Sequence, residues 1–381
     1  MACQKSAWRS QTRAFTSPTT ITKHIDLTDV LTIGCMNAQP PMADKPDPTV
    51  LVTVNMKSKL DFRDMRDIIA TALIHYKLPP VAVPILRDEL VTKSKSVIPG
   101  FDRSLLEGIA RVGATFGSAK SNTSSGKLGG FVELEFDGNK RDPIILGLTC
   151  FHFVRDDKDT TTTPPKWTKK AYAIFHANEK QNKYENLVQE IASLKAASEE
   201  IAEINVHLGH VAACSGDRFF VKAGEHTKHT FSVKMDWALL DIIPERLDPK
   251  GHDNNQHDFN TEGAEDAQPT QLWINGSVGP AGGVYSGLRT YVVSMPVAVG
   301  KEDKDGWMVL AQDKWSCEHT LLSRFDHPFT MPGSTGSLVH DWDGGVAGMV
   351  TGMLQYSGIA LFTYGDDLVG DIKGMTGAKG V

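Results

Sequence analysis

Three polar residues stand next to apolar segments of the chain and have side chains that could act together in a reaction. His152 follows the apolar run P-I-I-L-G-L-T-C-F, Asp236 precedes the run W-A-L-L-D-I, and Thr335 lies in the turn P-G-S-T-G-S-L-V. An imidazole can accept and return a proton near neutral pH, and a hydroxyl can act as a nucleophile when a base stands beside it. These residue types suit acyl transfer if the fold brings them together.

The order and surroundings of these residues resemble those of the chymotrypsin/trypsin-like serine peptidases. That family places its histidine in T-A-A-H, where this chain has T-C-F-H, and opens a strand with D-I-A-L-L, where this chain has D-W-A-L-L. Its nucleophile lies in G-D-S-G, where this chain has G-S-T-G. The resemblance covers about residues 113 to 375. It implies a mainly β fold, a chymotrypsin-like double antiparallel β-barrel.

The resemblance also implies a role for each matching residue. His152 would be the general base, Asp236 would orient its ring, and Thr335 would be the nucleophile. The backbone N–H groups of Gly333 and Thr335 would form the oxyanion hole. The segment G-V-A-G-M-V-T-G would line the substrate cleft through Val350, Thr351 and Gly352.

The nucleophile position departs from the family pattern. The Cβ methyl of Thr335 restricts χ1 and crowds a tight turn, and Ser334 replaces the aspartate that precedes the family's nucleophile. We therefore expect a degenerate, inactive peptidase homologue that binds proteins or peptides. The alternative is an active endopeptidase that uses Thr335. The neighbouring hydroxyls of Ser334 and Ser337 are interpreted as structural.

The sequence divides into four regions. Residues 1–47 end in a proline-rich stretch and predict a disordered leader, and residues 48–95 alternate strand, helix and strand patterns and predict a small α+β module. Residues 96–112 are expected to be a linker, and residues 113–381 the peptidase domain. Short apolar segments separated by Gly, Asp and Pro predict strands throughout that domain. The segment D-D-L-V-G-D-I-K-G-M-T-G-A near the C-terminus predicts a helix that ends near Gly377.

A helical insertion is expected at about residues 179–205, where apolar residues recur at spacings of three and four. Its single apolar stripe indicates that it packs against something. Packing on its own domain is the first interpretation, and self-association through this helix is the second.

Composition limits the possible partners and cofactors. The net charge of −6 gives no electrostatic reason to expect nucleic acid or a membrane as partner, and no apolar run is long enough to span a bilayer. His207 and His210, like His226 and His229, have H-x-x-H spacing, but residues three apart on a strand face opposite sides, so no metal is expected. The sequence suggests no cofactor. The expected partner is a protein or peptide.

The cysteines bear on the compartment. There are five, with no C-x-x-C pair, so they indicate neither a disulfide framework nor a zinc site. We expect all five thiols to be free and the protein to be cytoplasmic. Because Lys5, Arg9 and Arg13 precede the first acidic residue, a mitochondrial location is the alternative.

Overall fold

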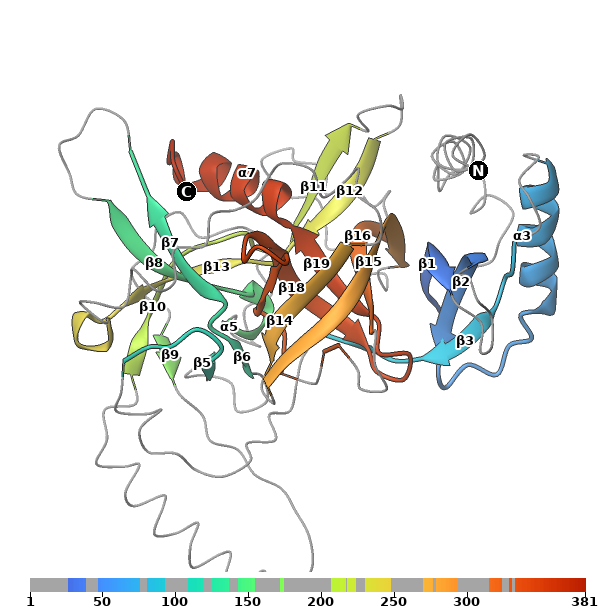
Figure 1. Cartoon of the computed structure of the whole chain (residues 1–381), viewed down its shortest axis with the longest axis horizontal. Coiled ribbons are helices and arrows are strands. Elements are labelled where there is room, and N and C mark those ends of the chain that lie inside the picture. Colours follow the sequence, from blue (N-terminus) through green and yellow to red (C-terminus); the bar gives the residue numbers. More distant parts are fainter. Residues whose placement is uncertain are drawn as a thin grey trace, which may run out of the picture.

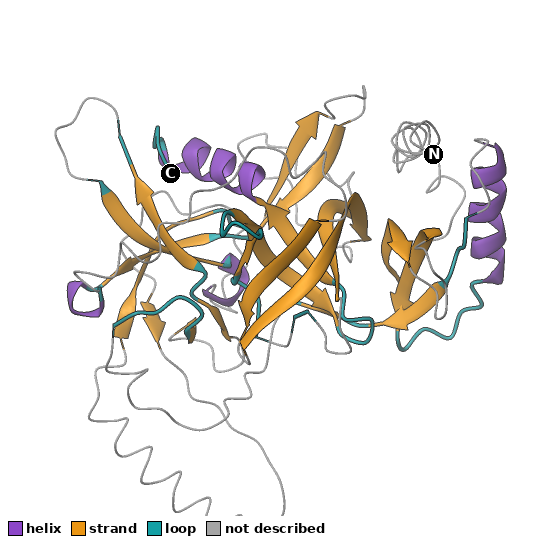
Figure 2. Ribbon diagram, in the orientation of Figure 1, coloured by secondary structure: helices purple, strands orange, loops and turns teal. Residues whose placement is uncertain are grey.

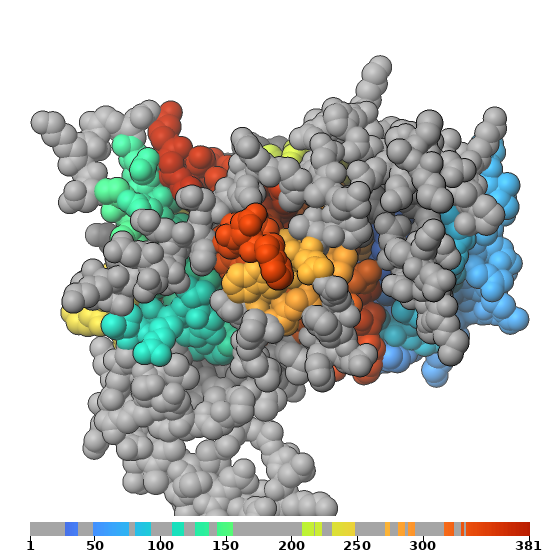
Figure 3. Space-filling model, viewed as in Figure 1, coloured from blue at the N-terminus to red at the C-terminus, as the bar shows by residue number. Residues whose placement is uncertain are grey.

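The fold is mainly β (Figure 2). The computed structural model describes residues 27–38, 47–75, 81–92, 109–118, 125–136, 143–154, 172–174, 207–216, 218–223, 230–247, 270–276, 279–293, 315–323, 329–330 and 333–381. The N-terminal elements, a barrel and a seven-stranded sheet lie side by side along the long axis of the molecule (Figures 1 and 3).

The central unit is a closed antiparallel barrel of six strands. It closes because β14 pairs with β17 on one side and with β15 on the other. Its interior is filled by apolar side chains that include Tyr285, Phe329 and Phe362. The strands are β14 (Thr270–Gly276), β15 (Gly279–Val293), β16 (Trp315–Ser323), β17 (Leu338–His340), β18 (Val346–Leu354) and β19 (Ala360–Tyr364).

The second unit is a seven-stranded sheet in the order β6-β5-β9-β10-β13-β8-β7. The two end strands of this order, β6 and β7, are consecutive in the chain and are separated only by Leu128 and Gly129. Its own apolar cluster includes Phe116, Leu148 and Trp237. The strands are β5 (Thr115–Ser118), β6 (Ser125–Lys127), β7 (Gly130–Leu134), β8 (Ile144–Thr149), β9 (Tyr172–Ile174), β10 (His207–Cys214) and β13 (Ala238–Ile242).

The N-terminal elements extend the sheet of the barrel. Strand β1 (Val30–Ala38) pairs with β15, β2 (Asp47–Asn55) pairs with β1, and β3 (Ile85–Asp88) pairs in parallel with β2. Helix α3 (Arg63–His75) connects β2 to β3 and packs Met65, Ile69 and Leu73 against the strands. The short strand β4 (Leu90–Val91) pairs with β18 of the barrel.

Two expectations for this region need correction. The predicted leader, residues 1–47, is not disordered as a whole, because Val30–Ala38 forms a strand between β15 and β2. The predicted strand–helix–strand elements are present, with β3 at the end of the sheet, but they have no sheet of their own. Pairing of β1 with β15 joins them to the barrel, so the structure gives no support to a separate α+β module.

The C-terminal helix agrees with the sequence pattern. Helix α7 (Gly365–Thr376) directly follows the last barrel strand, and Gly377 closes it with a φ of 75° and a hydrogen bond from its N–H to the Lys373 carbonyl (2.8 Å). Its apolar residues Leu368 and Ile372 belong to the core of the seven-stranded sheet. The helix therefore ties the end of the barrel to the other sheet.

Three shorter elements complete the description: the hairpin of β11 (Arg218–Ala223) and β12 (Thr230–Met235), helix α5 (Phe151–Val154), and a 3₁₀ helix at Pro244–Arg246. Among the described helices, none has the length and apolar character needed to cross a membrane. The expected helical insertion at 179–205 lies outside the described residues, as do His226, His229 and most of the expected linker at 96–112.

Candidate active site

His152 is held in place by both oxygens of one carboxylate. It lies on the single turn of α5, directly after β8 and Cys150. Its Nδ1 is 2.5 Å from Oδ2 of Asp236, and its backbone N–H donates to Oδ1 of the same residue (2.9 Å). The Asp236 carbonyl also accepts the N–H of Phe151 (3.3 Å). Backbone and ring are thus fixed by one partner 84 positions away in the sequence.

The environment keeps Asp236 ionised. Burial by itself raises the pKa of this carboxyl, but the His152 ring, its hydrogen bonds and the charge of Lys234 outweigh burial and hold the pKa below its ordinary value. An ionised Asp236 accepts a hydrogen bond from Nδ1–H and so leaves Nε2 as the free nitrogen of a neutral ring. This is the tautomer that a general base needs.

Trp237 anchors Asp236 from the neighbouring position. Its side chain is fully buried, its backbone N–H donates to Ser215 Oγ (3.0 Å), and its indole N–H donates to Asp371 Oδ2 on α7 (2.7 Å). Asp371 also forms an ion pair with Arg218 (2.5 Å). The C-terminal helix therefore helps to fix the segment that carries Asp236, a role that the sequence did not reveal for Asp371.

The turn that carries Thr335 depends on two glycines in the left-handed region. Gly333 has a φ of 93° and Gly336 a φ of 90°. A Cβ on Gly336 would lie 2.5 Å from the Lys127 carbonyl oxygen and 3.1 Å from Thr149 Oγ1, so this turn is packed against the strand that leads to His152. In the described part of the chain, the amide N–H groups of Gly333 and Thr335 form no hydrogen bond. Both remain available as donors, as the oxyanion-hole prediction requires.

Cys150 connects the two halves of the site. Its thiol donates to the Val350 carbonyl on β18 (3.2 Å), which also accepts the N–H of Gly336 (2.9 Å). On its other side, Cys150 Sγ lies within 4.8 Å of nitrogen and oxygen atoms of His152 and Asp236. The turn of Thr335 and the His152–Asp236 pair therefore contact the same buried residue. The T-C-F-H motif contains Cys150, but nothing in the sequence marked it as a contact between sheets.

The hydroxyl of Thr335 is buried and has no described partner. The residue is 5% exposed, and neither its Oγ1 nor Nε2 of His152 forms a hydrogen bond with any described group. The two atoms that would exchange a proton are thus both unsatisfied, and no hydrogen bond joins them. Ser337 Oγ is buried without a described partner as well. Ser334 forms at least one interaction.

The three residues expected in the substrate cleft have different environments. Val350 is fully buried in the barrel core, and its backbone is engaged with the Thr335 turn. Thr351 is half-buried, and its hydroxyl donates to the Leu361 carbonyl (3.4 Å). Gly352 lies beside Val91 and Thr92. Val350 is therefore bonded directly to the Thr335 turn, whereas Thr351 and Gly352 follow it along β18.

Cys150, His152 and Asp236 present ligand-type atoms close together, yet these atoms already have other roles. The carboxylate binds His152, the thiol donates to Val350, and burial followed by the charge of Asp236 raises the pKa of the thiol well above its ordinary value. A protonated thiol is a poor metal ligand. Four of the five cysteines, Cys35, Cys150, Cys214 and Cys317, are free, and Cys3 lies outside the described residues.

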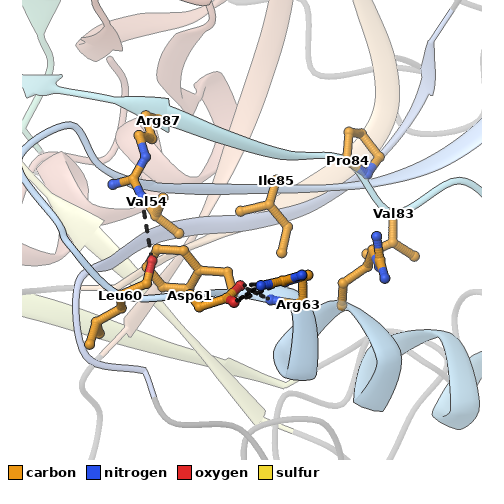
Figure 4. Close-up of a pocket in the computed structure, with 10 residues that line it drawn as sticks. Val54, Leu60, Asp61, Arg63, Val83, Pro84, Ile85 and Arg87 are labelled. Atoms are coloured by element: carbon orange, nitrogen blue, oxygen red, sulfur yellow. Dashed lines mark hydrogen bonds and ion pairs between the residues drawn. The ribbon is translucent and has the colours of Figure 1, made fainter.

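One pocket lies far from this site, between the start of α3 and β3 (Figure 4). It is lined by apolar residues that include Phe62 and Ile85, and by three arginines. Arg63 forms an ion pair with Asp61 (2.6 Å), Arg66 forms one with Asp67 (2.9 Å), and Arg87 donates to the Ser58 carbonyl. The three arginines that line the pocket therefore already have partners among the N-terminal elements.

Comparison with known proteins adds no assignment: no family model matches the chain, and no curated protein shows significant similarity to it.

Proposed function

We propose that the barrel and the seven-stranded sheet are the two barrels of a chymotrypsin-like fold, and that the chain is a homologue of the trypsin-like serine peptidases. Support for this comes from the arrangement of the strands. One unit is a closed six-stranded barrel, and the sheet order of the other begins and ends on consecutive strands. His152 and Asp236 come from the second unit, Thr335 from a turn of the first, and a helix follows the last strand.

The observation that carries this proposal is the double contact between Asp236 and His152. A structural histidine needs one hydrogen bond, whereas this ring and its backbone are both fixed by one buried carboxylate, with Nε2 unsatisfied. A ring oriented in this way can accept a proton at Nε2 and return it to a leaving group. The free amides of Gly333 and Thr335 would stabilise the oxyanion of an acyl intermediate.

We further propose that the site binds proteins or peptides and is impaired in chemistry. The Thr335 hydroxyl is not hydrogen-bonded to His152, and its methyl group restricts the rotation that would bring it there. Internal threonine is a poor nucleophile without its own α-amino group as base. Misalignment of this kind reduces the rate by about 100-fold or more.

A slow endopeptidase is the second candidate, and it is favoured by the unsatisfied Nε2 and Oγ1 atoms. Both are buried in the same site, where they would be expected to find partners unless a substrate completes the arrangement. In that case Thr335 would attack the peptide carbonyl when the substrate aligns it with His152.

Reaction with a small alkyl fluorophosphonate, followed by intact-mass measurement, distinguishes these candidates. We expect no adduct on the wild-type protein and one adduct on Thr335→Ser, because serine keeps the hydroxyl and removes the methyl. His152→Ala in the Thr335→Ser background should abolish the adduct. Equal labelling of wild type and variant would identify a working threonine peptidase. Labelling that persists without His152 would contradict the assignment of the base.

A further inference from the structure

Strand β4 occupies the edge of β18 next to the candidate active site. The two strands pair antiparallel, with Val91 opposite Met353 and Leu90 opposite Leu354. The pairing extends one step further, because the Gln355 N–H donates to the Glu89 carbonyl (2.9 Å). Figure 1 shows the chain passing from β3 to this part of the barrel. A segment near the N-terminus thereby adds a strand to the barrel.

This edge begins where the Thr335 turn ends. The turn is bonded to Val350, whose N–H donates to the Ser337 carbonyl (2.9 Å) and whose carbonyl accepts the Gly336 N–H. Only Thr351 and Gly352 lie between that residue and the pair formed by Met353 and Val91. A peptide whose reacting carbonyl lay at Thr335 and whose chain followed β18 would therefore reach the position of β4 within a few residues.

The direction in which β4 runs is the direction that such a peptide would have. Because the strands are antiparallel, β4 runs from Leu354 towards Gly352, and Thr92 already lies next to Gly352. Its C-terminal end is therefore the end nearer to the turn. Strand addition of this kind uses backbone hydrogen bonds for affinity and alternate side chains for specificity.

A buried carboxylate holds β4 near this edge. Asp88, the last residue of β3, is 1% exposed and accepts the N–H groups of Tyr356 (2.9 Å) and Ser357 (3.0 Å) in the turn that follows β18. The Asp88 carbonyl accepts the N–H of Met56 (2.8 Å), which links the same corner to β2. If β4 detached from β18, the hydrogen bonds of Asp88 would therefore still hold the chain close to this edge.

The β4 pairing itself is weak. It consists of two residues, and Leu90, Val91 and Thr92 are all half-buried. A strand that forms so few backbone hydrogen bonds opens easily, and a bound peptide that replaces these hydrogen bonds can displace it.

We propose that β4 is a resident strand that blocks a peptide-binding edge on β18, so that an extended peptide binds only when Leu90–Val91 is displaced. This inference rests on the proposed function, because it names the occupant and the regulation of the same site. The displacing ligand is an extended peptide with an aliphatic or β-branched side chain at the position of Val91.

Amide hydrogen exchange of the full chain tests whether β4 occupies this edge of β18. Val91→Pro removes the N–H that antiparallel pairing with Met353 uses, and Val91→Thr keeps both the N–H and the β-branched side chain as the matched control. We expect the backbone amides of residues 351–355, on β18, to exchange about 5- to 10-fold faster in Val91→Pro and at an unchanged rate in Val91→Thr. Wild-type exchange that is already as fast as in Val91→Pro would overturn the inference.

Peptide binding tests the second half of the inference. A fluorescent peptide with the sequence of residues 87–92 should bind Val91→Pro, measured by anisotropy, at least 10-fold more tightly than it binds wild type or Val91→Thr. A scrambled peptide should bind none of the three proteins. Equal binding to all three, or to none, would show that β4 does not guard a peptide site. Neither measurement uses Thr335, so failure of the fluorophosphonate experiment leaves these results independent.

Discussion

The Cys150 thiol donates a hydrogen bond to the Val350 carbonyl, and this contact joins two strands 200 positions apart in the sequence. Cys150 precedes His152 by two positions. The Val350 carbonyl also accepts the N–H of Gly336, which follows Thr335. The relative placement of His152 and Thr335 therefore depends on a buried contact between the barrel and the seven-stranded sheet. A change at this contact should alter the site without touching its polar groups.

Cys150→Ala tests that dependence. Loss of the buried sulfur and its hydrogen bond should destabilise the fold by about 1–2 kcal/mol and slow fluorophosphonate labelling in the Thr335→Ser background. Cys35→Ala is the control, because Cys35 is also buried (8% exposed, against 0% for Cys150) but lies on β1. It should cost similar stability in denaturant unfolding and leave the labelling rate unchanged. Equal labelling in both alanine variants would show that Cys150 only fills space.

Asp236→Asn should abolish most of the acyl-transfer capacity that Thr335→Ser gains. Asparagine has nearly the same shape, but it carries no charge and its NH₂ group can force the ring into the other tautomer. In serine peptidases, loss of tautomer control at a histidine–aspartate pair lowers the rate by about 10⁴-fold. We expect labelling of the double variant to fall by at least about 100-fold, measured by intact mass over time. A decrease of less than about 3-fold would reduce Asp236 to a structural partner.

Gly336→Ala should destabilise the protein because the turn has no room for a Cβ. The φ of 90° disfavours any side chain, and the added carbon would lie 2.5 Å from the Lys127 carbonyl oxygen, a backbone atom that cannot rotate away. We expect a loss of about 2–4 kcal/mol in denaturant unfolding. Gly374→Ala in α7 is the control: nothing lies within 4 Å of its Cβ position, and alanine favours a helix, so stability should stay equal or rise.

The sequence predicted the local features of the site correctly. An apolar strand before His152, a strand after Asp236, a glycine-bounded turn at Thr335 and a terminal helix closed by Gly377 all leave short-range signals in composition and spacing. The structure has each of these elements where the pattern indicated. Such features depend on neighbours in the chain, so a single sequence is enough to find them.

Long-range pairing was missed for a physical reason. Val30–Ala38 is as apolar as the strands that the sequence predicts, but the proline-rich stretch after it favours the interpretation of this segment as part of a leader. Its partners, β2 and β15, lie on opposite sides of it, and the residues of β15 that pair with it are 256 to 260 positions away. The pairing of β4 with β18 also joins segments that lie far apart in the sequence. The alternation of apolar residues indicates which face of a strand is buried, but it does not indicate which distant strand is its partner.

Buried Glu318 should make stability depend on pH. It lies on β16, is 4% exposed, and its Oε2 has no described partner. Burial raises the pKa of this carboxyl to about 7, although hydrogen bonds from Ser316 and from the Lys234 backbone act in the opposite direction. Between pH 4.5 and 7 the unfolded chain releases this proton while the folded protein retains it. The folded state is therefore favoured below about pH 4.5, and this advantage disappears as the pH rises to about 7.

Glu318→Gln removes the titration and keeps the shape of the side chain. Urea unfolding at pH 5 and pH 8 should show that the free energy of unfolding of wild type, relative to the variant, falls by about 2–3 kcal/mol over this interval. The same substitution at exposed Glu133 should leave the wild-type dependence intact, because that side chain faces solvent in both states. A difference between wild type and Glu318→Gln that is constant over this interval would mean that Glu318 is ionised in the folded protein. Its carboxylate would then have to be stabilised by groups near Lys234 strongly enough to offset its burial.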